Sequence, residues 1–272
     1  MHHPSLSILQ KPFTIMGIVN VTPDSFFDNG AHASVESAIA HGLKLVADGA
    51  DVLDIGGEST RPGAAAVDAT EEIRRVVLVI RGLAARTSIP ISIDTTKAAV
   101  AAAALDAGAV WVNDISAGRM DGDMVELVAH RQCPVVFMHS RKTPSTMQVQ
   151  PAYDDVVKEV CDELLDRVNL FIRAGVLNEN IIIDPGIGFA KRFEDNIVLL
   201  QKIDKILKLG FPLLLGTSRK SFIGTITGKS VENRLAGSLA TVAHAFLSGV
   251  RFFRVHDVAE TVDLLKVLAA IR

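Results

Sequence analysis

Residues 89–112 read IPISIDTTKAAVAAAALDAGAVWV, and this pattern decides the fold. The stretch begins with a short apolar run at 89–93, continues as an alanine-rich segment at 97–107, and ends with another apolar run at 109–112. The two runs are apolar almost throughout instead of alternating with polar residues, which is typical of parallel strands buried on both faces. We therefore predict a strand, a helix and a second strand here.

The same alternation extends to both ends of the chain. The predicted strands lie at 14–19, 51–55, 89–93, 109–112, 134–138, 181–183, 212–215 and 251–255. The predicted helices lie at 34–48, 70–86, 97–107, 123–130, 153–174, 192–209, 231–248 and 258–271.

Eight strand–helix units in 272 residues favour a closed barrel. A doubly wound sheet can also carry alternating units, but eight of them without a dividing linker match a (β/α)8 TIM barrel, which typically needs about 250 residues. We predict one α/β domain over residues 1–272. A short N-terminal extension before residue 14 is expected to form a hairpin that covers the bottom of the barrel.

The composition excludes several functional classes. With 49% hydrophobic and 22% charged residues, the chain can bury a sizeable core, which excludes disorder. A formal net charge of −3 without long runs of like charge argues against a nucleic-acid or membrane surface. Cys133 and Cys161 are far apart and form no zinc or disulfide motif, and Met1-His2-His3-Pro4 does not resemble a signal peptide. We expect a cytoplasmic protein.

Polar residues stand at the end of nearly every predicted strand, where such barrels form their active sites. Any one of them can instead cap the following helix. Asp94 and Asp184 fit that role poorly, because each directly follows an apolar run. Taken together, the pattern favours a site containing Asn20, Asp54, Asp94, Asn113, Met138-His139, Asp184, Ser218-Arg219-Lys220 and Arg254-Val255-His256. His139 could contact the ligand, but a structural role fits it at least as well, so we leave it out of the predicted site.

The residue types suggest the ligand. Carboxylates and amides in one basin repel one another unless they meet a donor-rich ligand or cations, so they suit a flat heterocycle with several N–H groups. Arg61, Lys220, Arg254 and His256 lie at later, loop-side positions and suit an anion such as pyrophosphate. One molecule with a donor-rich ring and a diphosphate would use both sets.

The residues around these positions form motifs that follow one another from about residue 13 to the end. They are MGIVNVTPDSF (16–26), DIGGESTRPG (54–63), SIDT (92–95), VNDI (112–115), DPGIGF (184–189), SRKS (218–221) and RVHD (254–257). In this order they resemble the signatures of the dihydropteroate synthase family, whose fold is the same barrel. The resemblance implies condensation of 6-hydroxymethyl-7,8-dihydropterin diphosphate with 4-aminobenzoate, giving dihydropteroate and pyrophosphate. It also implies a sulfonamide target in folate synthesis.

The family pattern implies roles for individual residues. The implied catalytic residues are Asp94, Lys220 and Arg254. The implied substrate-binding residues are Thr60, Arg61, Pro62, Asp94, Asn113, Met138, Asp184, Phe189, Lys220, Ser221, Arg254 and His256. Asn20 would ligate Mg2+ on the diphosphate. A homodimer is the family precedent, and the apolar last helices could supply its contact.

Within this set, the two ends of the substrate are held separately. Asp94, Asn113 and Asp184 would hold the pterin, with Lys220 on its carbonyl side and Arg254 over the ring. The residues that would gather the phosphate charge are Arg61, Arg254 and His256. Those that would line the 4-aminobenzoate site are Thr60, Pro62, Phe189 and Ser221.

The implied chemistry needs no nucleophilic side chain. Loss of pyrophosphate leaves a carbocation conjugated with the pterin ring, which Asp94 and Asp184 can stabilise while Mg2+ and cationic residues stabilise the leaving oxyanions. The aniline nitrogen then attacks. We expect the long loops at 21–33 and 58–69 to close over the site and exclude water.

Three other interpretations were weighed. A methyltetrahydrofolate-binding methyltransferase domain shares the barrel and the pterin floor but has no diphosphate to hold. A non-catalytic pterin-binding paralogue would be expected to lose some of the anion-binding or metal-binding residues, all of which are present here. Residues 224–230 (GTITGKS) resemble a phosphate-binding loop but have one residue too few between the glycines, so we predict a plain loop that leads into the helix at Val231.

Overall fold

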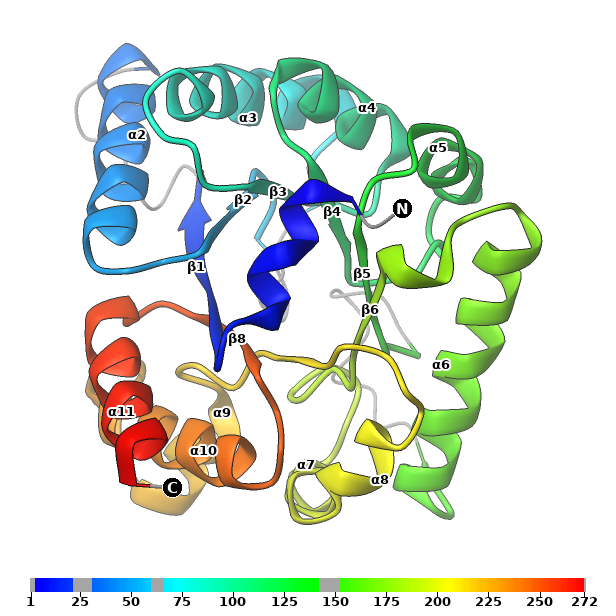
Figure 1. Cartoon of the computed structure of the whole chain (residues 1–272), viewed down its shortest axis with the longest axis vertical. Helices are drawn as coiled ribbons and strands as arrows, with labels where there is room; N and C mark the ends of the chain where they lie inside the picture. Colours follow the sequence, from blue (N-terminus) through cyan, green and yellow to red (C-terminus); the bar gives the residue numbers. More distant parts are fainter. Residues whose placement is uncertain (1–2, 22–30, 60–65, 142–151, 272) are drawn as a thin grey trace.

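The computed structural model describes residues 3–21, 31–59, 66–141 and 152–271. Its eight strands pair in parallel in the order β6-β5-β4-β3-β2-β1-β8-β7. A bridge between Ile183 and Leu213 joins the two ends of this series, so the sheet closes and the predicted (β/α)8 barrel is confirmed (Figure 1). The strands are β1 Thr14–Asn20, β2 Val52–Gly56, β3 Ile91–Asp94, β4 Trp111–Asp114, β5 Val135–Met138, β6 Ile181–Asp184, β7 Leu214–Leu215 and β8 Phe252–Val255.

Helices surround the barrel and follow the predicted order (Figure 1). The predicted helix at 192–209 breaks at Lys202, whose backbone leaves the helical region. The α-helices are α2 Ala31–Ala47, α3 Ala69–Ala84, α4 Ala98–Ala107, α5 Asp123–Arg131, α6 Val156–Arg173, α7 Phe193–Gln201, α8 Ile203–Leu207, α9 Ser221–Thr227, α10 Leu235–Leu247 and α11 Val258–Ile271. The 3₁₀ helices are η1 Pro4–Gln10, η3 Asn178–Asn180 and η4 Val231–Asn233.

The prediction of a plain loop at 224–230 is wrong in its first half, because Gly224 to Thr227 belong to α9. Thr225, Ile226 and Thr227 are β-branched and Gly224 has no side chain, so local propensity disfavours a helix here. The helix forms because Phe222 and Ile223 are buried and because Gly228 ends it in the left-handed conformation, with φ +70°. Tertiary packing therefore overrides propensity at this segment.

The predicted N-terminal hairpin is also wrong. The residues form the 3₁₀ helix η1, which lies across the barrel in Figure 1. Leu6 on this helix is buried, and Ser5 Oγ accepts a hydrogen bond of 2.6 Å from Trp111 Nε1. Trp111 is the first residue of β4, so η1 covers the amino-terminal end of the barrel, as expected of the extension.

The interior of the barrel is divided into two layers. The lower layer is apolar and consists of Leu6 packed with Met16, Val52, Trp111, Val136, Ile182, Leu214 and Phe252. Because side chains two positions apart on a strand share a face, the next inward residues along these strands form a second layer above it. In five strands those residues are Asp54, Asn113, Met138, Asp184 and Arg254, so the upper layer is mostly polar.

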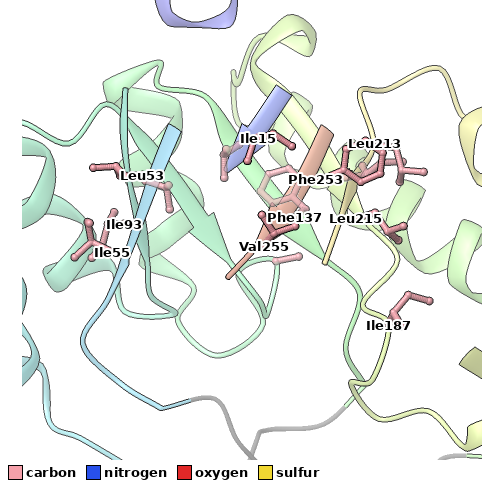
Figure 2. Close-up of a cluster of buried hydrophobic side chains, with 14 of the residues drawn as sticks. Ile15, Leu53, Ile55, Ile93, Phe137, Ile187, Leu213, Leu215, Phe253 and Val255 are labelled. Atoms are coloured by element: carbon pink, nitrogen blue, oxygen red, sulfur yellow. The ribbon is translucent and has the colours of Figure 1, made fainter. Parts of the chain in front are cut away.

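The strand residues that alternate with these inward-facing positions face outward and form the larger core against the helices. Leu53, Ile55, Ile93, Phe137 and Phe253 belong to this core, and Figure 2 shows them with their neighbours from other strands. This packing explains why the strands are apolar almost throughout their lengths. In the described part of the chain, no helix is both long and apolar enough to cross a membrane.

Candidate active site

Arg254 on β8 connects the polar residues of three other strands. Its Nε donates to Asp54 Oδ2 and its Nη2 donates to Asp94 Oδ2, each at 2.6 Å. Asn113 Nδ2 donates to the same Asp54 oxygen at 2.9 Å. One guanidinium therefore holds two buried or nearly buried carboxylates together at the carboxyl ends of the strands.

These contacts control the charge of Asp94. Burial raises the pKa of Asp94 to about 7; the Arg254 guanidinium opposes this rise, whereas Asp54 adds to it. Burial alone would lower the pKa of Arg254, but Asp54 and Asp94 outweigh it, so the guanidinium stays charged. Arg254 is thus the main group that favours the ionised form of Asp94 near neutral pH.

A second pair of opposite charges lies beside β6. Asp184 Oδ1 accepts a 2.7 Å hydrogen bond from the Gly186 N–H. Burial raises the pKa of Asp184 to about 6, which this hydrogen bond and Lys220 oppose. Burial lowers the pKa of Lys220 to about 8, which Asp184 opposes. The pKa values of both groups therefore lie near neutral pH, which is common in active sites.

Gly188 and Phe189 shape the path of the Lys220 side chain. Lys220 Nζ lies 3.9 Å from the centre of the Phe189 ring, a cation–π contact. A Cβ on Gly188 would lie 3.0 Å from Lys220 Cδ, and the φ of Gly188 is +82°. A glycine at this position therefore lets the lysine stem pass closely over the backbone.

His256, just beyond β8, is paired with Ser218, which follows β7. His256 Nδ1 lies 2.9 Å from Ser218 Oγ, and the His256 N–H donates to the same oxygen at 3.2 Å. Burial and the charge of Arg254 together lower the pKa of His256 to about 4, so the imidazole is neutral near pH 7. In this state it offers a neutral hydrogen-bonding group to an anion, not a positive charge.

The structure brings together many of the residues singled out from the sequence. Asp94, Asp184, Lys220 and Arg254 influence one another's pKa, and Asn113 joins them through Asp54. The others within the described residues lie at the same end of the barrel: Asn20 and Met138 end β1 and β5, Phe189 contacts Lys220, Ser221 begins α9 and His256 follows β8. Thr60, Arg61, Pro62 and most of the two long loops lie outside the described residues.

Asp54 belongs to this cluster, although the motif resemblance assigns it no role. Its side chain is fully buried and accepts hydrogen bonds from both Arg254 and Asn113. The signal was present in the sequence, because Asp54 follows Val52 by two positions just as Asn113 follows Trp111. The strand-end pattern therefore placed Asp54 in the predicted site, although no contact of its side chain could be predicted.

Comparisons with known proteins identify the family of this chain. A family model described as pterin binding enzyme matches residues 16–256. The chain is 41% identical over 267 residues to the dihydropteroate synthase of Bacillus subtilis, covering 98% of this chain and 91% of the relative. The chain belongs to the dihydropteroate synthase family.

Solved structures of this synthase family have the same fold. The Xanthomonas albilineans dihydropteroate synthase with 4-aminobenzoic acid superimposes with a TM-score of 0.90 and 49% identity, covering 97% of this chain and 94% of that chain. The same bacterium's synthase in complex with 7,8-dihydropteroate gives a TM-score of 0.87 and 45% identity, with coverage of 97% and 94%.

In this member of the synthase family, a second buried cluster supports the base of the loop after β2. Lys97 Nζ forms ion pairs with Glu58, at the start of that loop, and with Glu72 Oε2 at 2.6 Å. Glu72 is completely buried, whereas Glu58 Oε1 accepts a hydrogen bond from the Val67 N–H further along the loop. Lys97 thus compensates the buried charge of Glu72, and its ion pair with Glu58 anchors the start of the loop.

We expect Lys97→Met to lower the free energy of unfolding by about 3 kcal/mol, because it leaves Glu72 as an uncompensated buried charge. Urea unfolding measures the loss. Lys44→Met is the control, because the Lys44 side chain is 68% exposed and its ion pair with Asp48 should contribute less than about 1 kcal/mol. Equal stability of the two variants would show that Glu72 needs no counter-charge.

Proposed function

We propose that this chain condenses 6-hydroxymethyl-7,8-dihydropterin diphosphate with 4-aminobenzoate, releasing 7,8-dihydropteroate and pyrophosphate. The observation that carries the proposal is the contact of one guanidinium, Arg254, with two carboxylates, Asp54 and Asp94, at the carboxyl ends of the strands. The related proteins bind 4-aminobenzoic acid and 7,8-dihydropteroate, which are a substrate and the product of this reaction.

The pterin end of the substrate matches the upper layer of the barrel. A pterin ring presents several N–H donors, and the carboxylates of Asp94 and Asp184 and the amide of Asn113 can accept and donate along its edge. Lys220 supplies a donor for the ring carbonyl. Because these groups are held by Arg254, Gly186 and Phe189 before substrate binds, the ring meets a preorganised surface.

The reaction replaces a carbon–oxygen bond with a carbon–nitrogen bond. The bond between the pterin methylene carbon and the diphosphate oxygen breaks, and its electron pair leaves with the diphosphate. The 4-aminobenzoate nitrogen gives its lone pair to the methylene carbon and then loses a proton. Asp94 and Asp184 stabilise the positive charge that develops on the pterin, while Arg254 stabilises the oxygens that leave.

Asn20 fits a Mg2+ site that the diphosphate completes. Its amide oxygen is the hard ligand that Mg2+ prefers, the residue is half-buried at the end of β1, and its side chain makes no hydrogen bond to another described residue. The described residues contain no cluster of three or more His, Cys, Asp or Glu side chains suited to a metal. Bound Mg2+ would supply charge stabilisation for the departing pyrophosphate.

The 4-aminobenzoate site is proposed to include Phe189 and Ser221, together with Thr60 and Pro62. Arg61 and His256 are proposed to add to the phosphate side, where a neutral His256 donates or accepts a hydrogen bond. Two alternatives remain distinct from this proposal. A methyltransferase domain would not need the cationic groups Lys220 and Arg254 beside a diphosphate, and a binding paralogue would hold the pterin without turnover.

The decisive experiment is pyrophosphate release from the pterin diphosphate with Mg2+, measured with and without 4-aminobenzoate. We expect release that depends on 4-aminobenzoate, with dihydropteroate identified by its mass. Tight pterin binding without turnover would instead identify a binding paralogue. Failure to bind the pterin diphosphate at all would contradict the assignment of the site.

We further propose that the whole chain is one catalytic domain that acts in the cytoplasm as a homodimer. The unpaired Cys133 and Cys161 suit a reducing compartment. Exposed apolar side chains on α10 and α11 are the proposed contact with a second copy: Leu247 is 55%, Val267 60% and Ile271 75% exposed. Light scattering at micromolar concentration should give twice the mass of one chain, and a monomer would contradict the dimer.

A further inference from the structure

Lys191, at the end of the loop after β6, is half-buried, and its ammonium has unusual partners. Its Nζ lies 3.0 Å from the Gly186 carbonyl oxygen, 3.1 Å from that of Phe189 and 3.3 Å from that of His139. The His139 ring nitrogen Nδ1 also lies 3.0 Å from Nζ, so these four acceptors share the three N–H groups of the ammonium. Among the described residues, no carboxylate forms an ion pair with this ammonium. Lys191 therefore binds two loops together through neutral groups.

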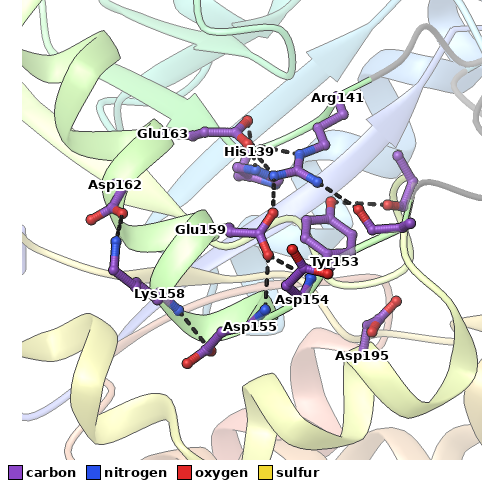
Figure 3. Close-up of polar contacts among 12 residues, drawn as sticks. His139, Arg141, Tyr153, Asp154, Asp155, Lys158, Glu159, Asp162, Glu163 and Asp195 are labelled. Carbon is purple, nitrogen blue, oxygen red and sulfur yellow. Dashed lines mark hydrogen bonds and ion pairs between the residues drawn. The ribbon is translucent and has the colours of Figure 1, made fainter.

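The direction of these hydrogen bonds fixes the state of His139. An ammonium can only donate, so Nδ1 of His139 accepts and Nε2 carries the ring proton. Nε2 lies 3.2 Å from Glu163 Oε2, and Arg141 Nε donates to the other Glu163 oxygen at 2.7 Å (Figure 3). Burial lowers the pKa of His139 to about 4, which agrees with a neutral ring. A series of hydrogen bonds through Lys191, His139, Glu163 and Arg141 therefore links the loop to α6.

The residues held by Lys191 are the same ones that contact the two charged groups of the site. Gly186, whose carbonyl binds Lys191, donates its N–H to Asp184 Oδ1. Phe189, whose carbonyl also binds Lys191, carries the ring that lies against the Lys220 ammonium. A shift of this loop would therefore displace the supports of Asp184 and Lys220 together.

A stability role alone explains Lys191 poorly. Burial lowers its pKa to about 7, which means that the ammonium is costly to desolvate even with Asp184 and Glu163 nearby. Apolar residues of similar volume can often replace even a buried ion pair at no cost in stability. A half-buried cation whose hydrogen-bond acceptors are all neutral is therefore better explained by what it orients.

We propose that Lys191 is a positioning residue for the proposed synthase reaction, acting by holding the Gly186 and Phe189 carbonyls so that Asp184 and Lys220 meet the pterin correctly. The inference rests on the proposed function. It concerns the loop's geometry, because the Lys191 ammonium contacts backbone oxygens and His139.

The test compares Lys191→Ala, Lys191→Met and Lys191→Arg in the dihydropteroate assay, with thermal unfolding of each protein. We expect Lys191→Met to unfold near the wild-type temperature yet to lose about 10²-fold in kcat, the loss expected when reacting groups are misplaced by about 1 Å. Lys191→Arg should recover part of kcat. For Lys191→Ala, ammonium chloride should raise kcat in a saturable manner, because ammonium can donate to the same carbonyl oxygens.

Sodium chloride and tetramethylammonium chloride at equal ionic strength are the salt controls, since neither can donate a hydrogen bond. Lys158→Ala is the matched variant, because Lys158 lies on α6 with its side chain 71% exposed, and its kcat should not change. If Lys191→Ala fails to fold, Glu163→Gln tests the same series of hydrogen bonds. We expect this variant to be stable and to lose less kcat than Lys191→Met.

The outcomes separate the two proposals. Wild-type kcat in folded Lys191→Met would overturn the positioning role while leaving the proposed function intact, as would a wild-type kcat in Glu163→Gln. Loss of kcat in Lys191→Ala that ammonium does not relieve would also overturn it. A wild-type protein that releases no pyrophosphate would overturn the proposed function itself.

Discussion

Arg254→Met is expected to lower kcat/KM on the order of 10³-fold, the loss typical of removing one preorganised charge from an active site. The substitution leaves Asp54 and Asp94 as two neighbouring carboxylates without the guanidinium that contacts both. It also removes a positive group beside Lys220, whose pKa Arg254 helps to lower. Steady-state kinetics with the pterin diphosphate varied at saturating 4-aminobenzoate measures the loss.

The same variant should change the pH profile in a defined direction. In the wild type, kcat/KM is expected to fall as pH drops through about 7, where Asp94 takes up its proton. Arg254 opposes the rise of that pKa, so its removal raises the pKa further and moves the acid limb of the profile to higher pH. An acid limb that stayed in place would mean that Asp94 does not control it.

Arg251→Met is a suitable control for both measurements. Arg251 lies just before β8, at the opposite end of the strand from the site, and its guanidinium donates to the Phe246 and Val250 carbonyl oxygens. We expect its kinetics and pH profile to match the wild type. If this variant lost as much activity as Arg254→Met, the loss would reflect the general stability of β8.

Asp94→Asn should separate binding from catalysis. We expect kcat to fall by about 10³-fold, whereas the dissociation constant of the pterin diphosphate should change only a few-fold, because the carbocation exists only along the reaction path. The asparagine oxygen can still accept from Arg254. Calorimetric titration gives the affinity, and single-turnover release of pyrophosphate gives the rate.

Stability supplies a second readout for this variant. Asp94 is costly to ionise where it lies, because burial and the charge of Asp54 both raise its pKa. A neutral asparagine removes that cost, so Asp94→Asn should unfold at or above the wild-type temperature. Asp106→Asn, whose side chain is 63% exposed, is the control with no expected effect on kcat. Equal losses of kcat and of affinity in Asp94→Asn would argue against a specific role in the transition state.

The barrel was predictable because its signal repeats. Each strand contains a run of apolar residues, and each helix follows at a similar spacing. One wrongly predicted detail, such as the helix break at Lys202, therefore does not change the topology. The two wrong segments lack such repetition. Helix α9 exists despite poor propensity because Phe222 and Ile223 are buried, and η1 is held by Trp111, which is distant in sequence. Long-range contacts of this kind leave no local pattern.

The site was predictable in its residues more than in its contacts. Motifs identify Asp94, Asp184, Lys220 and Arg254, but they do not reveal that Arg254 contacts both Asp54 and Asp94. They also do not reveal that a loop lysine, Lys191, binds the backbone on which Asp184 depends. These relations arise where strands far apart in sequence meet, so sequence spacing carries no information about them.

The two layers inside the barrel assign separate tasks to neighbouring positions of one strand. Val52 and Asp54 are separated by one residue, as are Phe252 and Arg254. The first of each pair packs in the apolar lower layer, whereas the second belongs to the charged upper layer. Substitutions in the upper layer can therefore alter which ring the barrel accepts without opening its base. A fold built in this way can change its chemistry one residue at a time while its apolar base stays closed.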